Sequence, residues 1–431
     1  MIEIEKDKEK NITQFCDYEP SWELEAEKTI NELKTIFKEN AVDIQHIGGT
    51  SMKKIKSKPV IDIIVGVHDL NSVDIMKNIL RNKGFIFDSK NYHGKKLLYK
   101  LDVQRKKTHI IYIVSYNGKI WFDYIIFRDY INMNDNKAKE YENLKLSVNG
   151  KYKYALPSYI KTKSDYINKI VSENFYQMML GKNVTVKLDC KTSFNYPKFS
   201  DGIYPLNCGH IKNLEINAYV MGVYDYNMSE EFTGTITAYI DNKQEKSFIV
   251  AKKNMIFYKP EIYKALKFYF QKIQENENKS SGIINDINYI NIICLHEKSC
   301  GAVVYTKDGE NIKFLLVKGS ASNSVGFPKG HMEKNETEAE TAVREIYEET
   351  SLNVVLHSDF KEEYEYTVKG YVHKKVVCFI AEFKASDKYK IRDSEIMEQW
   401  LLPYEKAYEM LTFSQSKIIL KNAYQNILKN M

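Results

Sequence analysis

The chain has 431 residues, 43% hydrophobic and 28% charged, which is a globular composition in a chain longer than one ordinary domain. No stretch approaches the roughly 18 apolar residues that a membrane-spanning helix needs, so we expect no membrane partner. The formal net charge of +6 is small for this length and the basic residues do not cluster, so we expect no general nucleic-acid binding.

The beginning of the chain, MIEIEKDKEKNITQF, is charged and lacks the apolar core of a signal peptide. We therefore expect a cytoplasmic protein. The six cysteines show no CxxC or other paired spacing, which predicts neither disulfides nor a structural zinc site. The sequence does not indicate an oligomeric state.

Two changes in composition divide the chain into three segments. A helical pattern ends around Met179 and meets Gly181, and an alternating, strand-like stretch follows. A second change is a polar stretch with Ser-Ser-Gly at its centre, which is typical of a linker. The sequence predicts domains at 1–179, 180–278 and 289–431, with a linker at 279–288.

The first segment alternates helices with apolar strands, such as the helix predicted at 23–40, and this is an α/β pattern. A Gly-Gly-Thr-Ser turn precedes an apolar strand that carries Asp62. The backbone of such a turn can approach a triphosphate, and a strand carboxylate can hold Mg²⁺. Asp62 is therefore a candidate metal ligand, and the candidate substrate-binding residues of the turn are Gly48, Gly49 and Ser51.

From about residue 15 to 175 this segment resembles the GrpB family, through YEPSW at 18–22, KPVID at 58–62, His109 and FRDYINMNDNKAKEYENLK at 127–145. The resemblance implies a nucleotidyltransferase-like fold that binds a nucleotide. Active transferases normally carry a second carboxylate two residues after the first, and that position is Ile64. Asp123, on a later apolar run, either completes a pair or is an ordinary strand-edge residue, so transfer stays open.

The middle segment is rich in short strands, ends in an amphipathic helix and resembles the inorganic pyrophosphatase barrel. The fitting residues are Tyr204, Pro205, Asn207, Gly209, Ala218, Tyr219 and Val220. The family's acidic metal motif is shortened here to 213–219, and the arginine expected after Asp189 is Cys190. Because too few carboxylates remain for a multi-metal site, we predict an inactive β-barrel that serves as a spacer, a phosphate-binding module or an interaction surface.

The third segment contains an acidic helix. Between Glu336 and Thr350 apolar residues recur at helical spacing, and Glu345, Glu348 and Glu349 stand at i, i+3 and i+4. That spacing brings three carboxylates to one face, where a hard divalent cation such as Mg²⁺ would replace their repulsion by coordination. An ordinary solvated acidic face is the alternative. It does not account for the glycine and the arginine placed around these glutamates.

The same stretch resembles the Nudix signature. The matching residues are Gly330, Glu336, Arg344, Glu345, Ile346, Glu348, Glu349 and Leu352. The resemblance implies an α+β domain with an α/β/α sandwich, and a hydrolase that uses Mg²⁺, or alternatively Mn²⁺, to direct water at a diphosphate-containing chain. It implies that Glu345, Glu348, Glu349 and the Gly330 carbonyl surround the metal and that Arg344 pairs with Glu336.

Among the three glutamates we choose Glu345 to orient or deprotonate the water, and Glu348 and Glu349 as the principal ligands. The final glycine of the signature is Ser351 here, at a position where the helix should end in a left-handed residue. A residue other than glycine costs on the order of 1 kcal/mol there. No metal ligand is lost.

The stretches GFPKGH and YEYTVKGYVHKKVVCFIAEF resemble the Nudix branch that splits dinucleoside polyphosphates asymmetrically. Lys329, His331 and Lys375 are then candidates to neutralise phosphate charge. Tyr366 is the candidate platform for stacking a base, with Tyr364, Tyr371 and Tyr404 as alternatives. Diphosphoinositol polyphosphates, capped RNA ends and simple nucleoside triphosphates stay open as substrates.

The leading hypothesis from the sequence is an Mg²⁺-dependent hydrolase of nucleoside or dinucleoside polyphosphates. A first alternative is a nucleotidyltransferase that acts through the first segment, with the third segment as an accessory. A second is a non-catalytic scaffold that senses nucleotides.

Overall fold

The structure is a computed structural model that describes residues 15–431, apart from 89, 91, 148–155, 191–204, 224–229, 242–244, 278–290, 310, 321, 334–335, 369–371 and 392–394. The predicted linker at 279–288, Tyr204 and Tyr371 lie outside the described residues. Among the helices that are described, none is long and apolar enough to cross a membrane.

The N-terminal region is built on a five-stranded sheet with the strand order β1-β2-β5-β4-β3. Its strands are β1 (Ala41–Ile47), β2 (Ile61–Val67), β3 (Ile86–Phe87), β4 (Lys95–Leu101) and β5 (Lys107–Ser115). Its α-helices are α1 (Ser21–Phe37), α2 (Lys77–Asn82), α3 (Lys119–Met133), α4 (Asp135–Ser147) and α5 (Leu156–Met178), with 3-10 turns at Lys38–Asn40, Gly49–Ser51 and Leu70–Met76. The predicted helix at 23–40 and the strand that carries Asp62 are confirmed as α1 and β2.

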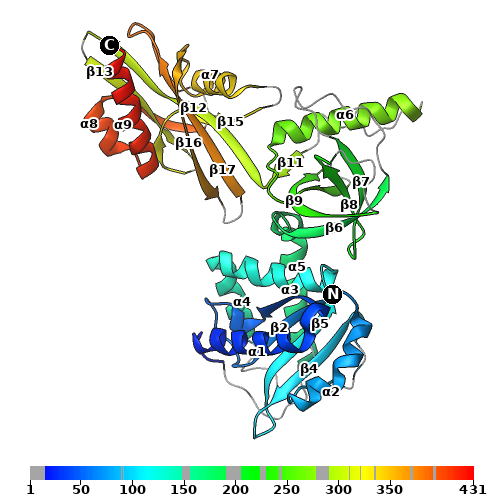
Figure 1. Ribbon diagram of the computed structural model, residues 1–431. Helices are drawn as coiled ribbons and strands as arrows, with labels where there is room; N and C mark the ends of the chain where they lie inside the picture. Colours follow the sequence, from blue (N-terminus) through cyan, green and yellow to red (C-terminus); the bar gives the residue numbers. More distant parts are fainter. Residues whose placement is uncertain are drawn as a thin grey trace. The chain divides into compact units, whose positions relative to one another are not determined.

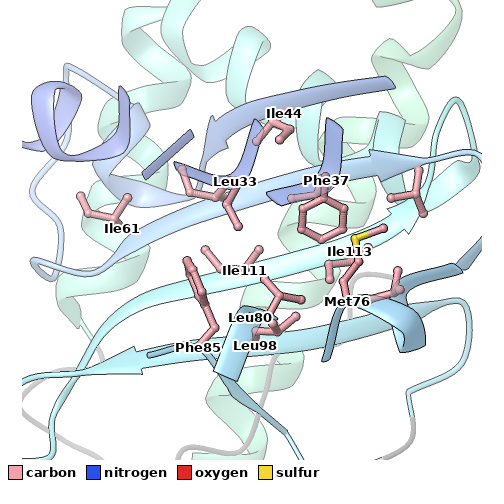
Figure 2. Packing of buried hydrophobic residues seen from close by; sticks show 14 of the residues in the cluster. Leu33, Phe37, Ile44, Ile61, Met76, Leu80, Phe85, Leu98, Ile111 and Ile113 are labelled. Atoms are coloured by element: carbon pink, nitrogen blue, oxygen red, sulfur yellow. The ribbon is translucent and has the colours of Figure 1, made fainter. Parts of the chain in front are cut away.

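Helix α1 covers one face of this sheet because its apolar residues recur at helical spacing. Leu33 and Phe37 are fully buried, and Figure 2 shows them packed with Ile61 of β2 and Ile111 of the central strand β5. β2 runs parallel to β5, whereas its other neighbour β1 is antiparallel. Both faces of β2 are covered, so Ile64 is fully buried and offers no place for a solvated second carboxylate.

The middle region contains a closed barrel, which confirms the predicted β-barrel. Five strands close through the pairing of the last with the fourth: β6 (Asn183–Cys190), β7 (Leu206–Ile211), β8 (Ile216–Met221), β9 (Glu231–Asp241) and β10 (Lys246–Ala251). Helix α6 (Lys259–Glu277) packs its apolar residues into the barrel core, as its amphipathic pattern predicts. The likeness to inorganic pyrophosphatase and the inactivity of the barrel stay predictions.

Two features of the barrel differ from the sequence analysis. Strand β11 (Asn291–Cys294), which falls in the predicted third segment, pairs with β9 of the barrel sheet. Cys208 is disulfide-bonded, so the prediction of no disulfides was wrong. Cysteines far apart in sequence can meet when strands of a closed barrel pair, and sequence spacing does not report that proximity.

The C-terminal region is built on a seven-stranded sheet. The path β14-β13-β12-β17-β16 is extended by β15 on β12 and by β18 on β13. The strands are β12 (His296–Asp308), β13 (Asn311–Gly319), β14 (Val325–Gly326), β15 (Lys329–His331), β16 (Val355–Val368), β17 (Val372–Glu382) and β18 (Ile396–Pro403). The helices are α7 (Glu338–Thr350), α8 (Tyr404–Met410) and α9 (Ser414–Lys429).

The helices cover both faces of this sheet, which gives the expected α/β/α layers (Figure 1). Helix α7 packs Ala342 and Ile346 against one face, and α8 and α9 pack on the other with Val303 and Ile380. β12 and β17 lie at the centre and run parallel. Side chains of these strands alternate between the α7 face and the α9 face, which decides which charged residues reach the candidate site.

Candidate active site

Gly330 brings the turn before α7 directly against the acidic face of that helix. Strand β15 pairs with β12, with Gly330 opposite Cys300. A Cβ added at Gly330 would lie 2.0 Å from the carboxylate of Glu345, closer than real Cβ atoms approach other atoms. Glycine is therefore needed here because the Glu345 carboxylate occupies the space of a side chain.

Arg344 links the turn to the helix, and its expected pair with Glu336 is present. Its Nε donates to Glu336 Oε1 at 2.5 Å and its Nη2 to Glu336 Oε2 at 3.0 Å, while Nη2 also donates to the carbonyl of His331 at 2.9 Å. These hydrogen bonds from Arg344 lower the pKa of Glu336 to about 2. Such a bidentate pair fixes both distance and orientation, so Arg344 holds the turn against α7.

The three glutamates predicted to surround a metal differ in their surroundings. Arg344 Nη1 donates to Glu345 Oε1 and to Glu348 Oε2, each at 2.8 Å. Glu349 is buried, with 7% of its surface exposed, and its Oε2 accepts from the backbone N–H of Lys329 at 3.2 Å. Burial raises the pKa of Glu349 to about 8 and raises that of Glu345 as well.

These carboxylates fit a hard divalent cation by their chemistry. The donor set is all oxygen, which Mg²⁺ prefers, and burial raises the pKa values of Glu345 and Glu349, so a cation bound beside them would offset the cost of keeping both carboxylates charged. Within the described part of the chain, however, no three His, Cys, Asp or Glu side chains are gathered closely enough to hold a metal ion. Glu345 and Glu348 face Arg344 instead, so metal binding requires at least one of them to turn away from it.

The phosphate-facing candidates occupy one side of β15. His331 is exposed, and its Nε2 lies 3.1 Å from Glu297 Oε2 and 3.2 Å from Lys374 Nζ. Burial, followed by the charge of Lys329, lowers the pKa of Lys374. Lys329, His331 and Lys374 are therefore neighbours, and the two lysines interact electrostatically with Glu349 and Glu345 of α7.

Lys375 lies apart from this group, and its role in neutralising phosphate charge stays a prediction. Neighbouring residues of a strand point to opposite faces. Lys375 lies with Val377 on the face of β17 that packs against α7, whereas Lys374 lies on the other face, beside Tyr366 and His331. The Nζ of Lys375 pairs with Glu363 Oε2 at 2.5 Å. Lys374 is the lysine that sequence reasoning missed, and the strand alternation that distinguishes the two lysines becomes readable only when the face of each strand is known.

Tyr366 lies on the same side of the sheet as Lys374. The two residues are direct partners in the pairing of β16 with β17. Tyr366 is 42% exposed and stacks on Tyr364, with ring centroids 6.0 Å apart and an interplanar angle of 18°. Tyr404 stacks instead on Tyr424 within the α8–α9 core. An exposed ring next to a lysine is the better platform for a base.

The Gly-Gly-Thr-Ser turn of the N-terminal region lies against Asp62, as the sequence predicts. A Cβ at Gly48, whose φ is +72°, would lie 2.1 Å from Asp62 Oδ2, so only glycine suits this position. Ser51 Oγ donates to the Gly48 carbonyl at 2.7 Å. A Cβ on Gly49 would lie 2.0 Å from Ser57 Oγ and 3.2 Å from Lys145 Nζ. The sequence analysis missed Lys145, a buried lysine at this turn.

Asp123 does not lie on a strand, so its expected place at a strand or strand edge was wrong. It lies on helix α3, is 2% exposed, and both of its carboxylate oxygens accept from Lys119 Nζ at 2.9 Å. The apolar run that suggested a strand is the buried side of α3. Asp62 is therefore the candidate metal ligand that remains from this region.

Different family models match the two ends of the chain. A model described as GrpB protein matches residues 13–173, and one described as NUDIX domain matches residues 295–421. The glutamate-rich protein GrpB of Alkalihalophilus pseudofirmus is 38% identical over 157 residues, which are 36% of this chain and 90% of that protein.

The asymmetrical bis(5'-nucleosyl)-tetraphosphatase of Rattus norvegicus is 27% identical over 141 residues, with 30% of this chain and 93% of that protein covered. A crystal structure of a C. elegans Ap4A hydrolase in a binary complex is 26% identical, covers 31% of this chain and 99% of its own, and gives a TM-score of 0.29. The chain belongs to the GrpB family through its N-terminal region, and its C-terminal region contains a NUDIX domain.

Proposed function

We propose that the chain hydrolyses a phosphoanhydride bond in nucleoside or dinucleoside polyphosphates, in the manner of the asymmetrical tetraphosphatases, by attack of water. The observation that carries the proposal is the approach of Glu345 to Gly330. That contact, together with Glu348 and Glu349, gathers the acidic face of α7 beside a phosphate-facing turn. Similarity to the rat tetraphosphatase over most of that protein's length supports the substrate class.

We propose Mg²⁺, with Mn²⁺ as the alternative, as the metal that the carboxylates of Glu345, Glu348 and Glu349 and the Gly330 carbonyl hold. When bound, the cation supplies a Lewis acid that polarises phosphate oxygens. Before it binds, the paired hydrogen bonds of Arg344 keep Glu345 and Glu348 oriented toward the same side of α7. Metal binding would replace at least one of these two hydrogen bonds.

The remaining roles follow from the placement of the side chains. Glu345 has a raised pKa and lies against the turn, so we assign it to orient or deprotonate the attacking water. Lys329, His331 and Lys374 neutralise phosphate charge, and the same role for Lys375 stays a prediction. Tyr366 stacks on a base beside Lys374.

The substrate can be identified by a panel assay with the full chain and Mg²⁺. Dinucleoside polyphosphates, capped RNA, diphosphoinositol polyphosphates and nucleoside triphosphates are compared, and the products are resolved by chromatography. We expect a dinucleoside polyphosphate to give the largest kcat/KM and to be cleaved asymmetrically. Absence of turnover on every member of the panel would reject the proposal.

The two alternative functions have less support. Transfer through the N-terminal region needs a second carboxylate, and Ile64 is buried while Asp123 is paired with Lys119. A scaffold without turnover gives no chemical role to the carboxylates that α7 gathers against Gly330. The first alternative is tested by incubating the wild-type chain and the Asp62→Ala variant with labelled nucleoside triphosphates. It requires that the wild type transfers the label and that the variant does not.

A further inference from the structure

Lys298 lies where the beginnings of two helices meet. Its Nζ is 3.0 Å from Glu338 Oε1, in the first turn of α7, and 4.5 Å from the ring centroid of Tyr258, which immediately precedes α6. Glu261, in the first turn of α6, also interacts electrostatically with Lys298. These residues belong to one compact unit that includes Gly234–Met431. One ammonium group therefore contacts both the barrel helix and the Nudix helix.

On the barrel side, Tyr258 is held in place by its neighbours. Phe257 and Ile262 are buried in the barrel core, and the backbone N–H of Tyr258 donates to Glu261 Oε2 at 2.5 Å, which satisfies an open donor at the start of α6. The backbone that carries the ring of Tyr258 is thus anchored to the barrel segment. A cation over the face of this ring is attracted by its electron density.

On the Nudix side, Lys298 supports the site at two points. Its carbonyl accepts from the backbone N–H of Met332, the residue after β15, at 3.1 Å. Its side chain, which is only 16% exposed, holds Glu338 together with Lys361, whose Nζ lies 2.7 Å from Glu338 Oε2. Glu345 lies seven positions further along α7, about 10 Å away at the rise of an α-helix. A shift of the first turn therefore moves the acidic face.

We propose that Lys298 is a positioning residue for the hydrolase site and that Tyr258 holds it, so that the barrel segment contributes to the geometry of the Nudix domain. The inference rests on the proposed function. Lys298 acts through Glu338 and the Met332 backbone and touches neither substrate nor metal. The middle region is then more than a spacer, because its helix start helps to fix the start of α7.

Paired variants test this role. Lys298→Met removes the charge and Lys298→Arg keeps a cation that can stack on an aromatic ring. Tyr258→Leu removes the ring and Tyr258→Phe keeps its face. We expect the Met and Leu variants to lose about tenfold in kcat/KM, mostly in kcat, and the Arg and Phe variants to stay within about twofold of wild type. Lys318→Met is the matched control, because Lys318 pairs with Glu398 at the same 3.0 Å on the same sheet.

Hydrogen exchange of the α7 amides supplies a second readout that does not depend on turnover. We expect faster exchange at the first turn of α7 in Lys298→Met and Tyr258→Leu, and wild-type exchange in the conservative variants and in Lys318→Met. If the wild type hydrolyses no polyphosphate, the proposed function fails while the exchange data still decide the positioning role. Wild-type kcat/KM and wild-type exchange in Tyr258→Leu overturn the inference, as do equal losses in Lys298→Arg and Lys298→Met.

Discussion

Replacing Gly330 by alanine should strongly lower the hydrolase activity while leaving the fold nearly intact. The new Cβ would lie 2.0 Å from the Glu345 carboxylate, whereas ordinary contacts begin at 3.4 Å, so the carboxylate must move by about 1.4 Å. Only the end of a flexible side chain has to move, so we expect a loss of stability below about 1 kcal/mol. Misplacing a reacting group by about 1 Å can cost about 100-fold in rate, and we expect a loss of kcat/KM on that scale.

Two further glycines give the assay its controls. A Cβ at Gly326 meets nothing within 4 Å, so Gly326→Ala should keep both activity and stability. A Cβ at Gly301 would lie 2.1 Å from the backbone carbonyl of Pro328, so Gly301→Ala should destabilise the domain. Steady-state hydrolysis and urea unfolding are measured for all three variants. Full activity in Gly330→Ala would refute the placement of Glu345 at the turn.

Three other predictions address separate features. Ser351 has φ 64°, and its buried Oγ has no hydrogen-bond partner among the described residues. Ser351→Gly should therefore raise the free energy of unfolding of the Nudix domain by about 1 kcal/mol, measured in urea. A less stable variant would contradict this. Tyr366→Ala should raise KM for a nucleotide substrate about tenfold, and Tyr366→Phe should not; an unchanged KM in the alanine variant removes the stacking role. Burial lowers the pKa of Lys145 to about 7, so above that pH the unfolded chain binds more protons than the folded chain. The free energy of unfolding should therefore rise between pH 7 and the ordinary lysine pKa of about 10.4. The same rise in Lys145→Met would show that another group causes it.

The sequence predicted those elements whose structure depends on residues close together in the chain. The helical spacing of apolar residues located α7, and the need for a left-handed residue at its end is confirmed by Ser351. The pair of Arg344 with Glu336 was implied by the Nudix resemblance, and the structure brings the two side chains together. The domain boundaries stay predictions.

The features that were missed depend on long-range packing. Lys374 and Lys375 point to opposite faces of β17, and α7 covers the face of Lys375. Two adjacent lysines in a sequence do not indicate which of the two faces a helix covers. In the sequence, Lys145 resembles an exposed helix residue. In the structure it is buried, and its Nζ donates to the Lys56 carbonyl at 2.8 Å. Asp123 was placed on a strand because a fully buried helix and a buried strand give the same apolar run.

The most direct test of the proposed hydrolase is turnover of the best polyphosphate substrate by the Glu349→Gln variant in Mg²⁺. Glutamine keeps the size of the side chain and removes the charge, and Glu333→Gln is the control because Glu333 is an exposed residue of the same turn. We expect Glu349→Gln to lose about 1,000-fold or more in kcat, the scale of several kcal/mol of charge stabilisation, and Glu333→Gln to lose nothing. Unchanged turnover in Glu349→Gln would contradict the assignment of the active site.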